Sequence, residues 1–177
     1  MLSWMKSRRV AIASAKHLYG AVVAAARRPE LFRAVNAADT PLGRFEVLAL
    51  HMVLVLERLE ADGAATEAAR RRLVEAFVED MDDSMREMGI GDLAVPKKVK
   101  KAAGALYDRV ATLRPLLATG AEPELAEALA RDVPAAPGAT IDAGRFARYV
   151  LSADRALAGQ PTESILGGQL PFARVAV

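Results

Sequence analysis

The 177-residue sequence contains no cysteine, and this absence excludes several classes of function at once. Without a thiol the chain can form no disulfide framework and can perform no thiolate chemistry. It has only two histidines, His17 and His51, and neither follows a glutamate by three residues, as the helical di-iron motif requires. A calcium loop over residues 80–91 also fails, because Met85 and Gly91 stand where a glycine and a bidentate glutamate are needed. We therefore predict no metal site and no cofactor.

The chain also lacks the arrangements that nucleophilic and phosphate chemistry need. None of its six serines has an acid–histidine pattern or a nucleophile elbow around it. No glycine-rich phosphate loop follows a strand. We therefore expect a protein that is not an enzyme.

Long apolar runs are absent too, and none reaches the length needed to span a bilayer. Ser7-Arg8-Arg9 is typical of a twin-arginine export signal, but only residues 10–12 would form the apolar stretch after it, so we expect no export. Residues 1–38 carry seven Lys/Arg and one acid, and Trp4 lies near their start. Such a basic N-terminus suits an anionic lipid surface, a ribosome or nucleic acid, unless its cations simply line a solvated helix face.

Aromatic residues make up only 5% of the chain, so alanine, leucine and valine must fill the interior. No stretch alternates like a strand and no internal repeat is visible, whereas helical periodicity with start and stop signals recurs. The sequence predicts an all-α, single-domain bundle of about six or seven helices over residues 1–177, with no sheet. The expected helices are 3–27, 29–36, 41–62, 66–88, 97–118, 123–131 and 145–158, and Thr66 is expected to cap the fourth of them.

Three segments break the helical pattern. Residues 1–14 form a basic N-terminus that we expect to be mobile. Residues 133–138 contain two prolines and predict a linker before the C-terminal helix. Residues 159–177 carry several glycines and prolines and predict an irregular tail.

The segment 41–62 is predicted to be the central core helix. Residues 47–56 are apolar almost all round, save His51, and a helix of that kind is buried on every side. His51 is expected to bond to a carbonyl or an acid. Arg44 and Glu46 are expected to pair internally with acids of residues 80–87, which would form an internal network of Arg44, Glu46 and His51.

Residues 80–92 combine an acidic helix end with a glycine-marked stop. Gly89 and Gly91 take positive φ at low cost, and Asp92 can cap the helix that follows. Acid near a helix C-terminus opposes the macrodipole, and such conflicts concentrate at functional sites. The alternative is two solvated helix ends that meet at one corner.

This corner also carries a resemblance. Met-Asp-Asp-Ser-Met-Arg-Glu-Met-Gly-Ile-Gly-Asp at 81–92, followed by Val-Pro-Lys-Lys at 95–98, resembles the core of the ubiquinol–cytochrome c chaperone family. These proteins are assembly factors for cytochrome b of the respiratory bc1 complex. Gly-Arg-Phe-Glu-Val-Leu-Ala-Leu-His at 43–51 and the pair Tyr107 and Arg109 match as well.

The resemblance implies a chaperone that binds newly made cytochrome b and assists assembly of the bc1 complex. It further implies peripheral work on the cytoplasmic face of the inner membrane, or on the matrix side in a mitochondrial member, with the ribosome as a possible partner. The alternative is a helical adaptor that binds ribosome or nucleic acid through its basic N-terminus. The expected partner-binding residues are Asp80, Met81, Asp82, Asp83, Met85, Arg86, Glu87, Met88, Gly89, Gly91, Asp92, Lys97, Lys98, Lys101, Tyr107 and Arg109.

Overall fold

The structure, a computed structural model, describes the backbone of residues 2–173 and the side chains of residues 14–173. Over that range the chain is all-α, with no strand. It forms eight α-helices and one 3-10 turn: α1 (Leu2–Ala26), α2 (Pro29–Val35), α3 (Pro41–Glu60), η1 (Gly63–Thr66), α4 (Glu67–Glu87), α5 (Val95–Thr119), α6 (Glu122–Asp132), α7 (Ala143–Ala158) and α8 (Thr162–Leu166).

Helix α3 begins where the sequence places a cap and a proline. The Thr40 side chain accepts a hydrogen bond from the Gly43 backbone N–H, and Pro41 occupies the first turn, where its missing donor costs nothing. Gly43 is required at this start, because a Cβ there would lie 1.9 Å from the carbonyl oxygen of Ala38. The chain therefore enters α3 through a tight approach that only glycine permits.

The rest of the molecule surrounds α3. Every residue from 46 to 56 is buried, as the all-round apolar pattern predicts. Helices α1, α4, α5 and α7 all pack against this helix, and one cluster of buried side chains runs through all of them. The prediction that 41–62 contains the core helix is confirmed, with the helix itself ending at Glu60.

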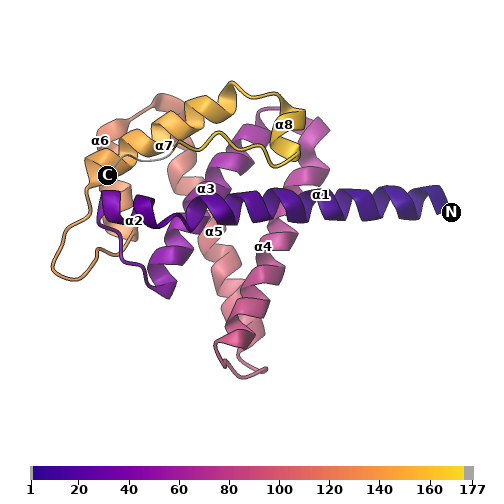
Figure 1. The fold of residues 1–177 in the computed structure, drawn as a ribbon, viewed down its shortest axis with the longest axis horizontal. Coiled ribbons are helices and arrows are strands. Elements are labelled where there is room, and N and C mark those ends of the chain that lie inside the picture. Colours follow the sequence, from indigo (N-terminus) through magenta and orange to yellow (C-terminus); the bar gives the residue numbers. More distant parts are fainter. Residues whose placement is uncertain (1, 174–177) are drawn as a thin grey trace.

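Two parts of the chain project from this body (Figure 1). The N-terminal end of α1 extends beyond the other helices. Helices α4 and α5 run side by side as a hairpin, whose turn lies at the far end from α7 and α8. The hairpin presents helix surface that the body does not cover.

Arg58 joins the end of α3 to the C-terminal helices. Its Nε donates to the carbonyl oxygen of Leu157 at 3.0 Å, and its Nη1 donates to Asp62 Oδ2 at 2.7 Å. The Leu157 carbonyl belongs to the last turn of α7, where carbonyls lack helical partners and a cation is favoured. This contact holds α7 across the end of α3.

The predicted linker and tail make more contacts and contain more helix than the sequence suggests. The segment 133–138 carries an isolated antiparallel bridge between Ala135 and Ala37, with the Ala38 N–H donating to the Pro134 carbonyl at 2.8 Å. The tail contains α8, so the described chain has eight helices rather than six or seven. Ile165 of α8 is buried in the core. The glycines and prolines on both sides of this segment predicted an irregular tail and gave no sign of the helix.

Two predicted helix caps are wrong. Thr66 makes no capping hydrogen bond to α4, since its hydroxyl donates to the Leu59 carbonyl at the end of α3. Asp92 does not cap α5, which begins after Ala94. Mobility of residues 1–14 stays a prediction: the backbone is helical from Leu2, but the side chains of residues 1–13 lie outside the described part. No helix in the described range is both long enough and apolar enough to cross a membrane.

A pair of leucine substitutions in one helix tests the core assignment. Leu54 is fully buried in α3, so Leu54→Ala should lower the free energy of unfolding by about 2–5 kcal/mol. Leu42 lies at the start of the same helix with 58% of its surface exposed, so Leu42→Ala should leave stability nearly unchanged. Denaturant unfolding monitored by circular dichroism measures both, and equal losses would contradict the assignment.

Candidate functional site

The hairpin turn between α4 and α5 follows the glycine stop that the sequence predicts. Gly89 adopts φ of +75°, and the Ile90 N–H donates to the Met85 carbonyl at 3.1 Å. The Gly89 N–H donates to the Arg86 carbonyl at 2.9 Å. This pattern of backbone bonds around a left-handed glycine closes a helix C-terminus and satisfies its free carbonyls. Gly91 keeps a negative φ, so only the first of the two glycines serves this role.

Arg86 holds the turn against α4. Its Nε donates to Asp82 Oδ2 at 2.6 Å and its Nη1 donates to Asp92 Oδ1 at 2.6 Å. The hydrogen bond to Asp82 raises the pKa of Arg86 above its usual value, and Asp92 adds to the effect. Asp92 is thus used by the turn itself, and two acids of the predicted site are paired within the chain.

The remaining acids of residues 79–87 fall into two groups: two contact α1, and two are exposed. Asp80 accepts a hydrogen bond from the Tyr19 hydroxyl at 2.8 Å, and Glu79 pairs with Lys16 at 3.1 Å, so both hold α1 against α4. Burial, together with the hydrogen bond to Asp80, raises the pKa of Tyr19. Asp83 and Glu87 are exposed and form no ion pair among residues 14–173. Only these two acids of the predicted site stand free of a described partner.

The methionines do not form one open apolar strip. Met81 and Met85 are half-buried, and Met81 packs against the core. Met88 has 58% of its surface exposed, and Leu93 in the turn is 100% exposed. Leu93 was absent from the predicted site, although an apolar residue inside a glycine-marked turn between two polar helix ends is a signal that could have identified it.

The lysines of the site lie along the outer side of the first turns of α5. Lys97, Lys98 and Lys101 are exposed, as is Lys100. Val95 and Ala102 occupy the buried side of the same turns. None of the four lysines takes part in an ion pair of the described side chains. Four cations of one sign at a helix N-terminus oppose the macrodipole, so the fold alone does not favour them.

Tyr107 and Arg109 point in different directions from α5 and do not share a groove. Tyr107 is exposed and lines an open cleft of about 850 Å³ between α3, α4 and α5. The cleft has an apolar floor and a charged rim. Its lining residues are Leu56, Glu57, Glu60, Glu67, Arg70, Arg71, Val74, Glu75, Val78, Glu79, Tyr107, Val110 and Arg114.

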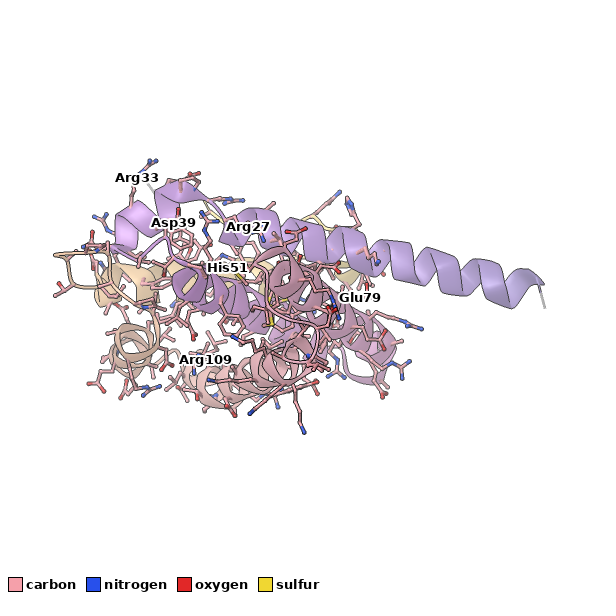
Figure 2. All side chains as sticks on the ribbon, turned by 90° about the horizontal axis from the view of Figure 1, so that it is seen from below. Arg27, Arg33, Asp39, His51, Glu79 and Arg109 are labelled. Atoms are coloured by element: carbon pink, nitrogen blue, oxygen red, sulfur yellow. The ribbon has the colours of Figure 1, made fainter. Side chains whose placement is uncertain are left out.

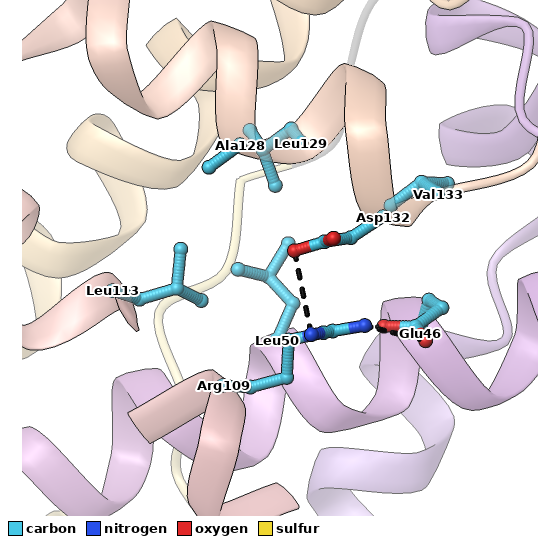
Figure 3. Close-up of a pocket in the computed structure, with 8 residues that line it drawn as sticks. All are labelled: Glu46, Leu50, Arg109, Leu113, Ala128, Leu129, Asp132 and Val133. Carbon is cyan, nitrogen blue, oxygen red and sulfur yellow. Dashed lines mark hydrogen bonds and ion pairs between the residues drawn. The ribbon is translucent and has the colours of Figure 1, made fainter. Parts of the chain in front are cut away.

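Arg109 instead joins three helices inside the molecule. Figure 3 shows its guanidinium between Glu46 of α3 and Asp132 of α6. Its Nε donates to Glu46 Oε2 at 2.8 Å, its Nη2 donates to Glu46 Oε1 at 3.0 Å, and its Nη1 lies 3.4 Å from Asp132 Oδ2. The hydrogen bonds to Glu46 raise the pKa of Arg109, against the opposing effect of burial. Because Glu46 is only 7% exposed, this pair is structural.

The predicted internal network of Arg44, Glu46 and His51 does not form. Arg44 pairs with Asp39 on the surface, with its Nε 2.5 Å from Oδ1. Glu46 pairs with Arg109, so among the described side chains neither residue joins the acids of 80–87. The prediction missed that Arg109 of α5, which also pairs with Asp132 of α6, would meet Glu46. Figure 2 shows Asp39, His51 and Arg109 in separate places on the molecule.

His51 is satisfied deep inside the fold. Its Nδ1 lies 2.8 Å from the Val47 carbonyl oxygen, which can only accept, so Nδ1 carries the proton. Its Nε2 then accepts from the Tyr149 hydroxyl at 2.7 Å. Phe172 packs edge-on against the ring, with centroids 4.8 Å apart. Burial lowers the pKa of His51 to about 4, so the ring is neutral at physiological pH.

Comparisons with known proteins agree with this geometry. The family model described as "Ubiquinol-cytochrome C chaperone" matches residues 33–172. Among solved structures, the crystal structure of the Cbp3 homolog from Brucella abortus is 32% identical, with a TM-score of 0.81 over 98% of this chain and 97% of that one. A comparison with curated proteins found no match.

Removing Arg109 tests its structural role. Arg109→Ala leaves Glu46 buried without a partner, so the free energy of unfolding should fall by about 3 kcal/mol. Arg114→Ala removes an arginine of the same helix whose pair with Glu57 lies at the surface, and it should cost at most about 1 kcal/mol. Urea unfolding of both variants decides this, and a smaller loss for Arg109→Ala than for Arg114→Ala would refute the assignment.

Acid should weaken the fold through His51. The unfolded ring titrates near pH 6.5 and the folded ring near 4, so the unfolded chain binds more protons between these values. Stability is therefore full above about pH 6.5 and falls as the pH drops toward 4, by up to about 1.4 kcal/mol per pH unit. His51→Gln keeps a polar group opposite Tyr149 and should flatten the pH slope of the unfolding free energy. An unchanged slope would exclude His51 as its source.

Proposed function

Because this chain belongs to the ubiquinol–cytochrome c chaperone family, we propose that it is a non-enzymatic assembly chaperone that holds newly made cytochrome b for the bc1 complex. The observation that carries the proposal is the family match over residues 33–172. The likeness to the Cbp3 homolog from Brucella abortus, over nearly the whole length of both chains, supports it. We place this work on the cytoplasmic face of the inner membrane.

The α4–α5 hairpin is the part of the fold we assign to the client. A chaperone for an apolar client needs exposed apolar surface with charged edges, and the hairpin offers both. The cleft that Tyr107 lines has apolar residues on its floor and charged residues on its rim. A helical client segment with an apolar face would fit such a groove, with charges on the rim to set its orientation.

Asp83 and Glu87 are the acids we expect to contact the client. Both are exposed on α4 and have no ion-pair partner in the described part of the chain. By contrast, Asp80 accepts a hydrogen bond from Tyr19, and Asp82 pairs with Arg86. Carboxylates left free at a helix C-terminus do not serve the helix. They would instead attract a client segment whose apolar stretch is flanked by lysine or arginine.

A pair of isosteric changes tests this assignment. Asp83→Asn with Glu87→Gln removes two exposed charges, so the melting temperature should not fall, because acid at a helix C-terminus opposes the dipole. Capture of cytochrome b should fall about three- to tenfold, which corresponds to roughly 0.7–1.4 kcal/mol. The measurement is co-purification of cytochrome b with the tagged chain in cells that express the bc1 subunits.

The matched control is Glu124→Gln with Glu127→Gln, which removes two exposed acids from α6. This control should capture the client like the unmodified chain. A thermally stable hairpin variant that still captures cytochrome b at the original level would rule out the acids as the client site. Failure of the unmodified chain to retain cytochrome b would overturn the function itself.

A further inference from the structure

The end of the α4–α5 hairpin exposes large apolar side chains that no other described part of the chain covers. Leu93 is 100% exposed and Met88 is 58% exposed, with the half-buried Ile90 between them in the chain. Among the described side chains, the exposed large apolar residues are Leu42, Met88, Leu93 and Tyr107, so two of the four lie in this one turn. The turn is also the part of the hairpin farthest from the body (Figure 1).

The same end is basic on its α5 side. Lys97, Lys98, Lys100 and Lys101 begin four residues after Leu93 and line the outer side of α5, all of them exposed. No described carboxylate pairs with any of them, as noted above. Arg86 is bound to both Asp82 and Asp92, so these three groups together keep only one negative charge. The α5 side therefore presents four free cations beside an exposed leucine.

From this juxtaposition we infer that the hairpin end docks on an anionic lipid surface. Leu93 and Met88 enter the headgroup region, and the lysines at 97, 98, 100 and 101 lie over lipid phosphates. Apolar side chains beside clustered lysines are the combination that binds peripheral proteins to anionic membranes. The anionic surface also satisfies the cations that the dipole of α5 disfavours.

This contact differs from the one expected of the basic N-terminus. It uses the turn that connects α4 to α5, at the end of the hairpin that lies far from α8. It does not depend on whether the chain holds cytochrome b. It leaves Asp83 and Glu87 on the α4 side, where an anionic membrane would repel them toward solvent. Docked in this way, the hairpin would keep its acidic side free for a client while its basic side faces lipid.

A fluorescence measurement tests insertion of the turn directly. Trp4 is the chain's only tryptophan, so Leu93→Trp combined with Trp4→Phe places the single indole at the turn. Adding phosphatidylcholine vesicles that contain phosphatidylglycerol should shift its emission to the blue, and pure phosphatidylcholine vesicles should not. Leu42→Trp combined with Trp4→Phe is the control, because Leu42 is exposed to the same extent as Met88 but lies on α3. No shift at position 93, or an equal shift at position 42, would overturn the inference.

Vesicle flotation of the full chain tests the lysines. Lys97→Gln with Lys98→Gln should weaken binding to the phosphatidylglycerol vesicles at least about fivefold, since each lysine near such a surface contributes roughly that factor. Raised salt should remove the remaining binding. Lys6→Gln with Arg8→Gln and Arg9→Gln separates the N-terminal contribution. If that N-terminal variant loses all binding while the hairpin variant floats like the unmodified chain, the lipid contact does not lie on the hairpin.

Discussion

The burial of α3 on every side is the constraint on which the rest of the structure depends. A helix that is apolar all round must be enclosed, and a chain with 5% aromatic residues encloses it with helices rich in alanine, leucine and valine. Two polar side chains of α3, Glu46 and His51, are buried with it, and each has a partner on another helix. Glu46 receives Arg109 from α5, and His51 receives Tyr149 from α7. These partners fix where α5 and α7 lie, because an unpaired buried carboxylate or imidazole would be costly.

The enclosure of α3 leaves the hairpin with a different role. Residues of α4 and α5 near the body supply core side chains such as Phe77 and Leu106, both fully buried. Toward the turn, fewer side chains of the two helices are buried and more are charged and exposed. The acidic side chains lie on α4 and the lysines lie on α5. No ion pair of the described side chains joins these two groups across the turn, so each remains available to something outside the chain. The fold thus places its packed side chains near the body and exposed charge at the hairpin end.

The sequence predicted the helices well because their signals are local. The proline starts at 29 and 41, the glycine stops at 89 and 120 and the helical apolar periods each act within one element. The helix α8 was missed because its apolar contacts come from only two adjacent residues, Ile165 and Leu166, in a segment with many glycines and prolines. That most of the candidate residues lie around one turn between two helices was also predictable, but the partners of their side chains were not.

Those partners depend on elements distant in the chain. Arg44 and Glu46 were expected to join the acids of 80–87 in an internal network, and Asp80 was expected to face a client. Glu46 instead meets Arg109, and Asp80 meets Tyr19. Tyr107 and Arg109 lie two residues apart on a helix, which turns them to different sides, and only the placement of α6 shows which of them is enclosed. Side-chain spacing fixes a face of a helix, whereas the neighbour that covers this face is set by the tertiary fold.

The contact between Arg28 and the end of the chain has a consequence for the order of folding. Arg28 Nη1 donates to the Phe172 carbonyl at 2.9 Å across 144 residues of sequence, and the Phe172 ring packs on His51. The covering of this part of the core helix therefore depends on a contact between segments far apart in the sequence. Contacts between such distant segments form late, because loop closure must come before they contribute. A chain that has formed its helices but not yet this contact would leave the ring of His51 uncovered by Phe172.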